Sequence, residues 1–179
     1  AGLMVLSQFV FSAQFGSITS AEALADFNAQ AVSLVRDVFA VPALAGMVVD
    51  SHLVKRDRME RLVTFMGRTV LDGWTSLAAA RAIGVEAKAA LLIEGSRARL
   101  AGPGAAYFLN ASNVAPQACS TTNPALTFPN IQIQRMEAKD QAFDLAGWTP
   151  ATGSAPMVSY DVSALCGEMF SSQGGNKLY

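Results

Sequence analysis

Hydrophobic residues between positions 43 and 83 recur at the spacing of an amphipathic helix. Successive members of the set lie three or four residues apart, so a helix would place them on one face. The set comprises Met59, Val63, Met66, Val70, Trp74 and Leu77. Arg56 and Glu60 can pair on the opposite face, and Gly84 is typical of the left-handed turn that ends a helix. The pattern therefore predicts one long helix over residues 43–83.

This predicted helix is longer than the domain that contains it. At about 1.5 Å of rise per residue it would span roughly 60 Å. A compact domain of this length is roughly 40 Å across, judged from its expected radius of gyration. We therefore expect either a break at Gly67 or Gly73, where each glycine costs about 1 kcal/mol relative to alanine, or a helix end that packs against something outside the chain.

A second helix is predicted just before the long one. Thr19 and Glu22 form the capping-box pattern, in which the threonine caps the helix and the glutamate reaches back to it. The apolar residues that follow are spaced alternately by three and four, which suits packing against another helix. They are Leu24, Phe27, Ala31, Leu34 and Val38. Pro42 would stop or kink this helix, so the two helices are expected to form a hairpin.

The first 18 residues carry no charge and are rich in large apolar side chains. The segment suits a helix with Leu3, Leu6 and Val10 on one stripe, but Gln8 to Phe11 also suits a strand, so both alternatives stay open. We expect the segment either to pack on its own core or to form an interface with another subunit. The expected interface residues are Leu3, Leu6, Phe9, Val10, Phe11 and Phe15.

The composition changes after residue 100. Six of the seven prolines lie beyond this point, and several stand beside glycine or asparagine in turn-forming pairs. Alternating apolar and polar residues predict strands within 131–134, 141–148 and 157–165. Residues 85–100 suit either a helix or a strand.

Together these segments predict an α+β fold. An N-terminal helical hairpin or bundle, containing one long helix, would be followed by a small antiparallel sheet with long loops. At 179 residues the chain fits a single domain. Within it we distinguish an uncharged apolar segment at 1–18, a helical region at 19–100 and a loop-rich β region at 101–179 that packs on the helices.

Cys119 and Cys166 are the only two cysteines, and both lie in the loop-rich region. A disulfide between them would close a loop of about 47 residues and stabilise the fold by about 4 kcal/mol, because it lowers the entropy of the unfolded chain. It would also indicate an extracytoplasmic location, such as the periplasm, the cell surface or a virion. The alternative is two buried thiols. The loop-rich surroundings favour the disulfide.

The chain is unusually poor in charge. Only 15% of its residues are charged, compared with about a quarter in typical domains, while 51% are hydrophobic and the mean hydropathy is +0.30. Such a composition indicates burial against copies of the same chain or against other assembly subunits. A net charge of −1 gives no electrostatic reason to expect direct readout of nucleic acid. No uninterrupted apolar run is long enough for a transmembrane span.

The sequence contains few of the residues that enzymes use. His52 is the only histidine and is far from both cysteines, so no zinc-binding spacing is present. Asp50, Ser51 and His52 are adjacent, and adjacent side chains on a helix point about 100° apart, which does not form a nucleophile and its base. We therefore expect His52 to lie on a helix surface. The sequence predicts no catalytic residue, metal ligand or cofactor site.

These observations favour a non-enzymatic structural or assembly subunit. The expected setting is a larger extracellular or envelope complex, such as a pilus or a secretion or conjugation apparatus, or else a virion. The alternative hypothesis is a module that binds a small molecule or peptide in an apolar pocket between the hairpin and the sheet. The residues expected to line that pocket are Trp74, Phe108, Phe143 and Trp148.

Overall fold

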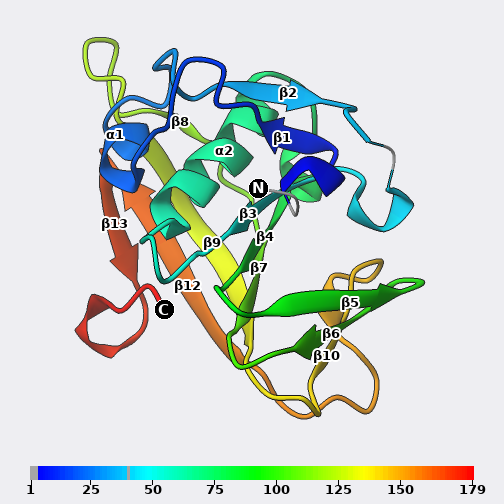
Figure 1. Cartoon of the computed structure of the whole chain (residues 1–179). Coiled ribbons are helices and arrows are strands. Elements are labelled where there is room, and N and C mark those ends of the chain that lie inside the picture. Colours follow the sequence, from blue (N-terminus) through cyan, green and yellow to red (C-terminus); the bar gives the residue numbers. More distant parts are fainter. Residues whose placement is uncertain (1–3, 40) are drawn as a thin grey trace.

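The computed structural model describes residues 4–39 and 41–179, and most of its regular structure is β-strand (Figure 1). The α-helices of this described part are α1 (Ser20–Ala25) and α2 (Met59–Leu71). Its strands are β1 (Phe9–Phe11), β2 (Leu34–Arg36), β3 (Met47–Ser51), β4 (Arg81–Val85), β5 (Ala90–Glu94), β6 (Arg97–Ala101), β7 (Ala106–Asn110), β8 (Gln117–Ala118), β9 (Leu126–Met136), β10 (Ala142–Asp144), β11 (Thr149–Pro150), β12 (Val158–Leu165) and β13 (Glu168–Ser171).

The strands of the described residues form two sheets. The larger is a mixed sheet of nine strands in the order β13-β12-β9-β7-β4-β3-β1-β2, with β8 paired to β9. The smaller is an antiparallel sheet of four strands in the order β11-β10-β6-β5. The smaller sheet packs on one face of the larger and α2 packs on the other, so the fold has three layers.

A parallel βαβ unit, made of β3, α2 and β4, lies at the centre of the large sheet. β3 pairs in parallel with β4, where Val48 is opposite Ala82, and also with β1, where Phe9 is opposite Val48. All five residues of β3 are buried. A strand covered on both faces carries a continuous apolar run instead of an alternation of apolar and polar residues.

The predicted fold class is wrong, because the first half is not a helical hairpin and the second half does not form a small antiparallel sheet of its own. The strands β7, β9, β12 and β13 instead join β1 to β4 in the nine-stranded mixed sheet. Residues 43–83 do not form one helix, since only Met59–Leu71 is α-helical and β3 and β4 flank it. The apolar stripe is real over this shorter range, and the helix ends just before Gly73, whose φ is +69°. The prediction fails elsewhere because the buried parallel strands lack the alternation that identifies a strand.

The helix predicted over residues 19–42 is also much shorter than expected. Its start is confirmed, because the Thr19 hydroxyl accepts from the Glu22 amide while the Glu22 carboxylate accepts from the Thr19 amide. The helix already ends before Asp26, which is extended. Part of the remainder forms β2 instead, where pairing with β1 satisfies the backbone that a helix would have satisfied internally.

The strand predictions in the second half are confirmed, except that residues 145–148 of the range 141–148 form a turn. Residues 131–134 lie in β9, and the ranges 141–148 and 157–165 contain β10 and β12. For two segments the sequence leaves both helix and strand open, and each of them contains strands in the structure. The N-terminal segment contains β1, and residues 85–100 contain β5 and most of β6.

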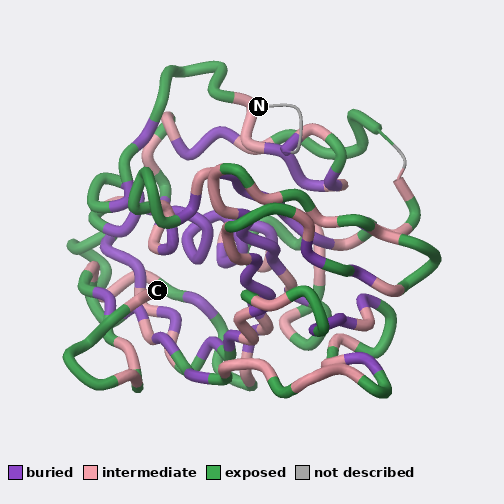
Figure 2. Tube along the Cα trace, turned by 60° about the horizontal axis from the view of Figure 1, so that its bottom comes forward, coloured by how far each residue is buried: buried purple, intermediate pink, exposed green. Residues whose placement is uncertain are grey.

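Two apolar clusters lie on opposite faces of the large sheet, and Figure 2 shows the buried chain gathered in the interior. Side chains on β3 divide between them. Val48 joins the cluster under α2, whereas Met47 and Val49 join the cluster against the small sheet. Phe65 of α2 and Phe143 of β10 are fully buried on the two sides. The central strands are therefore held rigidly from both faces.

Cys119 and Cys166 form a disulfide, as predicted. The bridge joins the segment after β8 to the turn between β12 and β13. A disulfide of this kind indicates an oxidising, extracytoplasmic location. Within residues 4–39 and 41–179, no helix is both long and apolar enough to cross a membrane.

Candidate functional site

The parallel strands β1 and β3 end at the same edge of the large sheet, and a cleft of about 520 Å³ opens there. The segments that follow the two strands both contribute to it. The cleft is lined by Met4, Val5, Phe11, Ser12, Ala13, Ser17, Ser51, His52, Arg56, Arg58 and Arg61. Ligands of open α/β sheets bind outside the carboxyl ends of the strands. We therefore treat this cleft, called the β1–β3 cleft below, as the candidate site.

A buried ion pair joins β3 to α2 beside this cleft. The Asp50 side chain is fully buried. Its Oδ2 accepts a hydrogen bond of 2.7 Å from Arg61 Nε, and its Oδ1 accepts one of 2.9 Å from Arg61 Nη2. Arg58 Nη1 lies 3.3 Å from the same Oδ1 and donates to the Ser51 carbonyl at 2.8 Å. Because a bidentate arginine–carboxylate pair restricts both partners, the strand and the helix are locked together.

The Arg61 guanidinium is enclosed from several directions. Its central carbon lies 5.1 Å from the centre of the Phe11 ring and 5.4 Å from that of Phe65, and these two rings stack at 4.9 Å. Its Nη1 donates to the Ile18 carbonyl at 3.2 Å. Aromatic faces and a carboxylate both stabilise a desolvated cation. Arg61 is therefore a fixed positive charge at the wall of the cleft.

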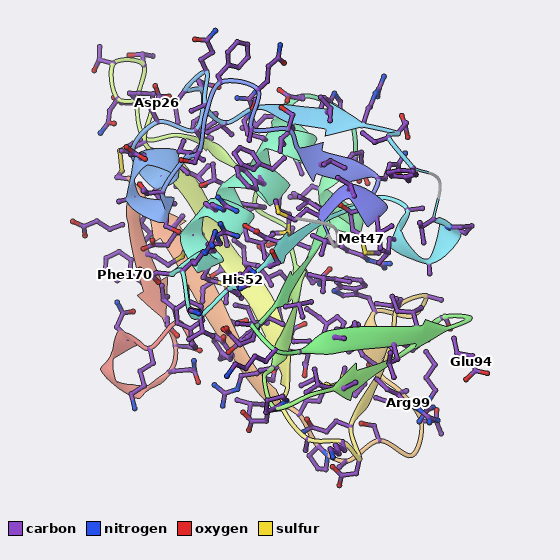
Figure 3. All side chains as sticks on the ribbon, in the orientation of Figure 1. Asp26, Met47, His52, Glu94, Arg99 and Phe170 are labelled. Atoms are coloured by element: carbon purple, nitrogen blue, oxygen red, sulfur yellow. A yellow bond between two sulfur atoms is a disulfide. The ribbon has the colours of Figure 1, made fainter. Side chains whose placement is uncertain are left out.

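His52 and Ser51 both have polar atoms without partners beside the cleft. The φ of His52 is +57°, a left-handed conformation that is uncommon for residues other than glycine. Seven buried side-chain atoms of the described residues have no hydrogen-bond partner, and two of them, His52 Nδ1 and Ser51 Oγ, lie beside the cleft. Figure 3 shows His52 on the loop after β3. Backbone strain and unsatisfied polar groups concentrate at functional sites, because selection for stability alone would remove them.

Contacts with β4 and with Glu86 just after it hold the loop that carries His52. Leu53 is fully buried against Gly84 of β4, where an added Cβ would lie 2.5 Å from a leucine methyl group. The Glu86 carboxylate accepts hydrogen bonds of 2.7 Å from the Val54 amide and 3.2 Å from the next amide. The strained histidine is therefore fixed in place by its neighbours.

The cleft carries a surplus of positive charge. Arg56, Arg58 and Arg61 line it, and none of its described lining residues is acidic. Asp50 lies behind the cleft and balances one of these charges, whereas Asp57 and Glu60 lie beyond the arginines in an adjoining cleft. Arg56 is exposed and forms no ion pair within the described ranges. Burial is the main cause that lowers the pKa of Arg58, but a guanidinium stays protonated at neutral pH.

A second cleft, of about 480 Å³, adjoins the first and shares its three arginines. It differs in carrying the acidic residues Asp57 and Glu60. Burial, and then the neighbouring Asp57, raises the pKa of Glu60. An anion would meet repulsion from these carboxylates, so the β1–β3 cleft suits an anion better.

The residues predicted as an interface have different positions in the structure. Phe9 and Val10 are buried in the core, and Phe11 is half-buried beside Arg61. Leu6 and Phe15 are exposed. Leu3 lies outside the described residues.

Three of the four residues predicted to line an apolar pocket come together. Phe108 and Phe143 stack with their ring centres 3.9 Å apart, and the Trp148 ring stands edge-on to Phe143 at 5.3 Å. Trp74 lies on the opposite face of the large sheet, 5.7 Å from Phe9 between ring centres. The three aromatic rings form part of the packed core between the two sheets.

His52 does not lie on a helix surface, as the sequence predicts, but in the loop between β3 and α2. A signal for this arrangement was present. The run Met47–Val49 is apolar and ends in two β-branched residues, and it precedes a charged loop and an amphipathic helix, which is the order expected of a βαβ unit. The pairing of Asp50 with Arg61 has no comparable signal in the sequence.

The described residues include no cluster of three or more histidine, cysteine, aspartate and glutamate side chains that could hold a metal ion. The polar side chains that line the cleft are those of arginine, serine and histidine. A scan against models of protein families found no match to this chain, and a search of curated proteins found none either.

Proposed function

We propose that this protein binds a small anionic molecule in the β1–β3 cleft and that His52 exchanges a proton with it. One observation carries the proposal: a strained histidine with an unpartnered buried nitrogen stands in a cleft lined by three arginines. If this proton transfer assists a reaction of the bound molecule, the protein is an enzyme, in contrast to the non-enzymatic role that the sequence favours.

The arginines support an anionic ligand. A guanidinium presents several N–H donors in one plane, an arrangement that matches carboxylate and phosphate groups. Arg61 already donates two hydrogen bonds to Asp50, and Arg58 donates to both Asp50 and the Ser51 carbonyl. Arg56 is the most available of the three, because it is exposed and forms no ion pair within the described ranges. We therefore expect Arg56 to bind the ligand directly.

The position of His52 supports proton transfer. Histidine is the side chain whose ordinary pKa lies closest to neutral pH, so it can both accept and donate a proton there. The Ser51 hydroxyl, also unpartnered and lining the cleft, adds a neutral donor and acceptor. The reaction class supported is general acid–base chemistry on a carboxylate- or phosphate-bearing substrate.

The test uses inorganic phosphate and succinate as probes, with binding measured by isothermal titration calorimetry. Arg56→Ala is expected to weaken binding about tenfold or more, because a hydrogen bond to a charged group contributes about 1.5–3 kcal/mol. Arg99→Ala is the matched control, since Arg99 is exposed on β6 of the small sheet, away from His52 (Figure 3). Equal affinities in both variants would contradict the assignment of the ligand to this cleft.

His52 can be followed directly because it is the only histidine. Its imidazole C–H signals in a proton NMR spectrum are expected to move on binding of either probe. His52→Asn is the variant of choice for activity assays, because asparagine tolerates the left-handed conformation. Imidazole signals that stay in place while a probe binds would remove His52 from the site.

A second candidate, an assembly subunit, is supported by exposed apolar side chains near the edge strand β2. Leu6, Phe15, Val35, Val38 and Phe39 are exposed, and the exposed fraction of Phe39 reaches 54%. Unpaired strand edges and apolar patches favour association. The setting would be an extracellular or envelope complex, or a virion. Light scattering over a concentration series checks this candidate, and a monomer at every concentration would contradict it.

A further inference from the structure

We infer that Tyr179 is a positioning residue for the β1–β3 cleft, holding the loop of residues 52–58 so that Arg56 and His52 meet the ligand. The inference rests on the proposed function, because it concerns the affinity of that same site. Tyr179 is distant in sequence from every lining residue of the cleft.

The hydroxyl of Tyr179 makes two hydrogen bonds at the end of this loop. It donates to Asp57 Oδ1 at 2.8 Å and accepts from the Met59 amide at 3.0 Å. Met59 is the first residue of α2, and Arg58 before it provides no side-chain cap. The first amides of a helix have no partner within the helix. Tyr179 therefore supplies the acceptor that the sequence around the helix start lacks.

The tyrosine is itself anchored elsewhere in the core. Its ring meets Tyr107 edge-on, with ring centres 6.1 Å apart. The Leu178 carbonyl accepts a hydrogen bond of 2.7 Å from the Tyr160 hydroxyl. Tyr107 and Tyr160 stand on β7 and β12 of the large sheet. The loop is thus tied through Tyr179 to strands that do not border the cleft.

This connection bears on ligand binding because the clamped residues flank the arginines. Asp57 lies between Arg56 and Arg58, and its φ of +47° is a left-handed conformation that the loop alone does not favour. The Tyr179 hydroxyl also donates a hydrogen bond to the Asp57 carboxylate. Without this hydrogen bond, the carboxylate would be available to pair with Arg56 in place of a ligand anion. A loop that must be ordered on binding lowers affinity.

The experiment compares Tyr179→Phe with Tyr107→Phe. Both variants keep an aromatic ring and lose one hydroxyl, but only the Tyr179 hydroxyl contacts the loop among the interactions of the described residues. Hydrogen exchange is measured at the Met59 amide, which is expected to be protected in the wild type. Phosphate affinity is measured by calorimetry, together with the imidazole signals of His52. In Tyr179→Phe we expect faster exchange at Met59, shifted imidazole signals and about tenfold weaker phosphate binding.

The outcomes separate the clamp from the proposed function. An unprotected Met59 amide in the wild type, or equal protection in both variants, overturns the clamp. Faster exchange with unchanged affinity and unchanged imidazole signals overturns the positioning role. If the wild type binds no phosphate, the proposed function fails, while the imidazole signals still decide whether Tyr179 positions His52. Equal losses of affinity in both variants also overturn the inference, because they assign the effect to general packing.

Discussion

Replacing Asp50 by asparagine tests whether the buried ion pair holds the candidate site together. The substitution keeps the size of the side chain and removes its charge. Asp50 is fully buried, and Arg61, which donates two hydrogen bonds to it, exposes only 3% of its surface. The change therefore leaves a largely buried guanidinium at the wall of the cleft without its counter-charge.

The expected loss of stability follows from these contacts. Breaking a buried ion pair by removing one partner costs about 3–5 kcal/mol, because the remaining charge stays desolvated. The aromatic rings of Phe11 and Phe65 beside Arg61 offset part of this cost, on the order of 1 kcal/mol. We therefore expect Asp50→Asn to lower the free energy of unfolding by about 3 kcal/mol. Domains are typically stable by about 5–15 kcal/mol, so the variant should still fold.

The matched control lies on the same helix. Arg68 and Asp72 form an ion pair of 3.1 Å across one turn at the end of α2, with side chains that are 20% and 30% exposed. A pair that water reaches contributes only about 0.3–0.5 kcal/mol, so Asp72→Asn should change stability little. Urea unfolding is followed by tryptophan fluorescence. The midpoints are compared between variants whose free energy of unfolding falls with urea concentration at the same slope. A loss below about 1 kcal/mol in Asp50→Asn, or equal losses in the two variants, would refute the reasoning.

Two further predictions concern packing and pH. Gly84→Ala should lower stability by about 1–3 kcal/mol, because the new Cβ would lie 2.5 Å from a methyl group of the fully buried Leu53. Gly174→Ala is its control, since nothing lies within 4 Å of a Cβ there, and equal melting temperatures would contradict the prediction. Burial raises the pKa of Tyr107 from 10.0 to about 12. The unfolded chain therefore loses the Tyr107 proton at a lower pH than the folded chain does. The contribution of protonated Tyr107 to the stability of the fold is complete below pH 10 and is lost as the pH rises toward 12. Over this pH range, the urea midpoint should fall less steeply with pH in Tyr107→Phe than in the wild type. The same dependence on pH in both proteins would contradict the prediction.

Several local features could be predicted from the sequence because they depend on neighbouring residues. The capping box of Thr19 and Glu22 needs only a spacing of three residues and is present as predicted. The strands β9 and β12 alternate apolar and polar side chains because only one side chain in two faces the core. The pairing of Cys119 with Cys166 followed from there being two cysteines in a loop-rich region.

The extent of the helices could not be predicted in the same way. The apolar residues of β3 and β4 follow one another without alternation, because both faces of these strands are covered, and they resemble parts of a helix. Leu34 and Val38 continue the helical spacing from α1 by coincidence, and Leu34 pairs with β1 instead. In each case, the partner that decides the backbone conformation lies far away in the sequence.

The candidate site depends almost entirely on tertiary structure. By itself the sequence determined the start of α1, the apolar stripe of α2, the alternating strands and the disulfide, all of which arise from short-range spacing or from composition. Only the fold brought Asp50 to Arg61, put His52 into a left-handed loop and placed the Tyr179 hydroxyl at the start of α2. These contacts join residues on different elements, and their energies arise from burial, which the sequence pattern of one segment does not contain.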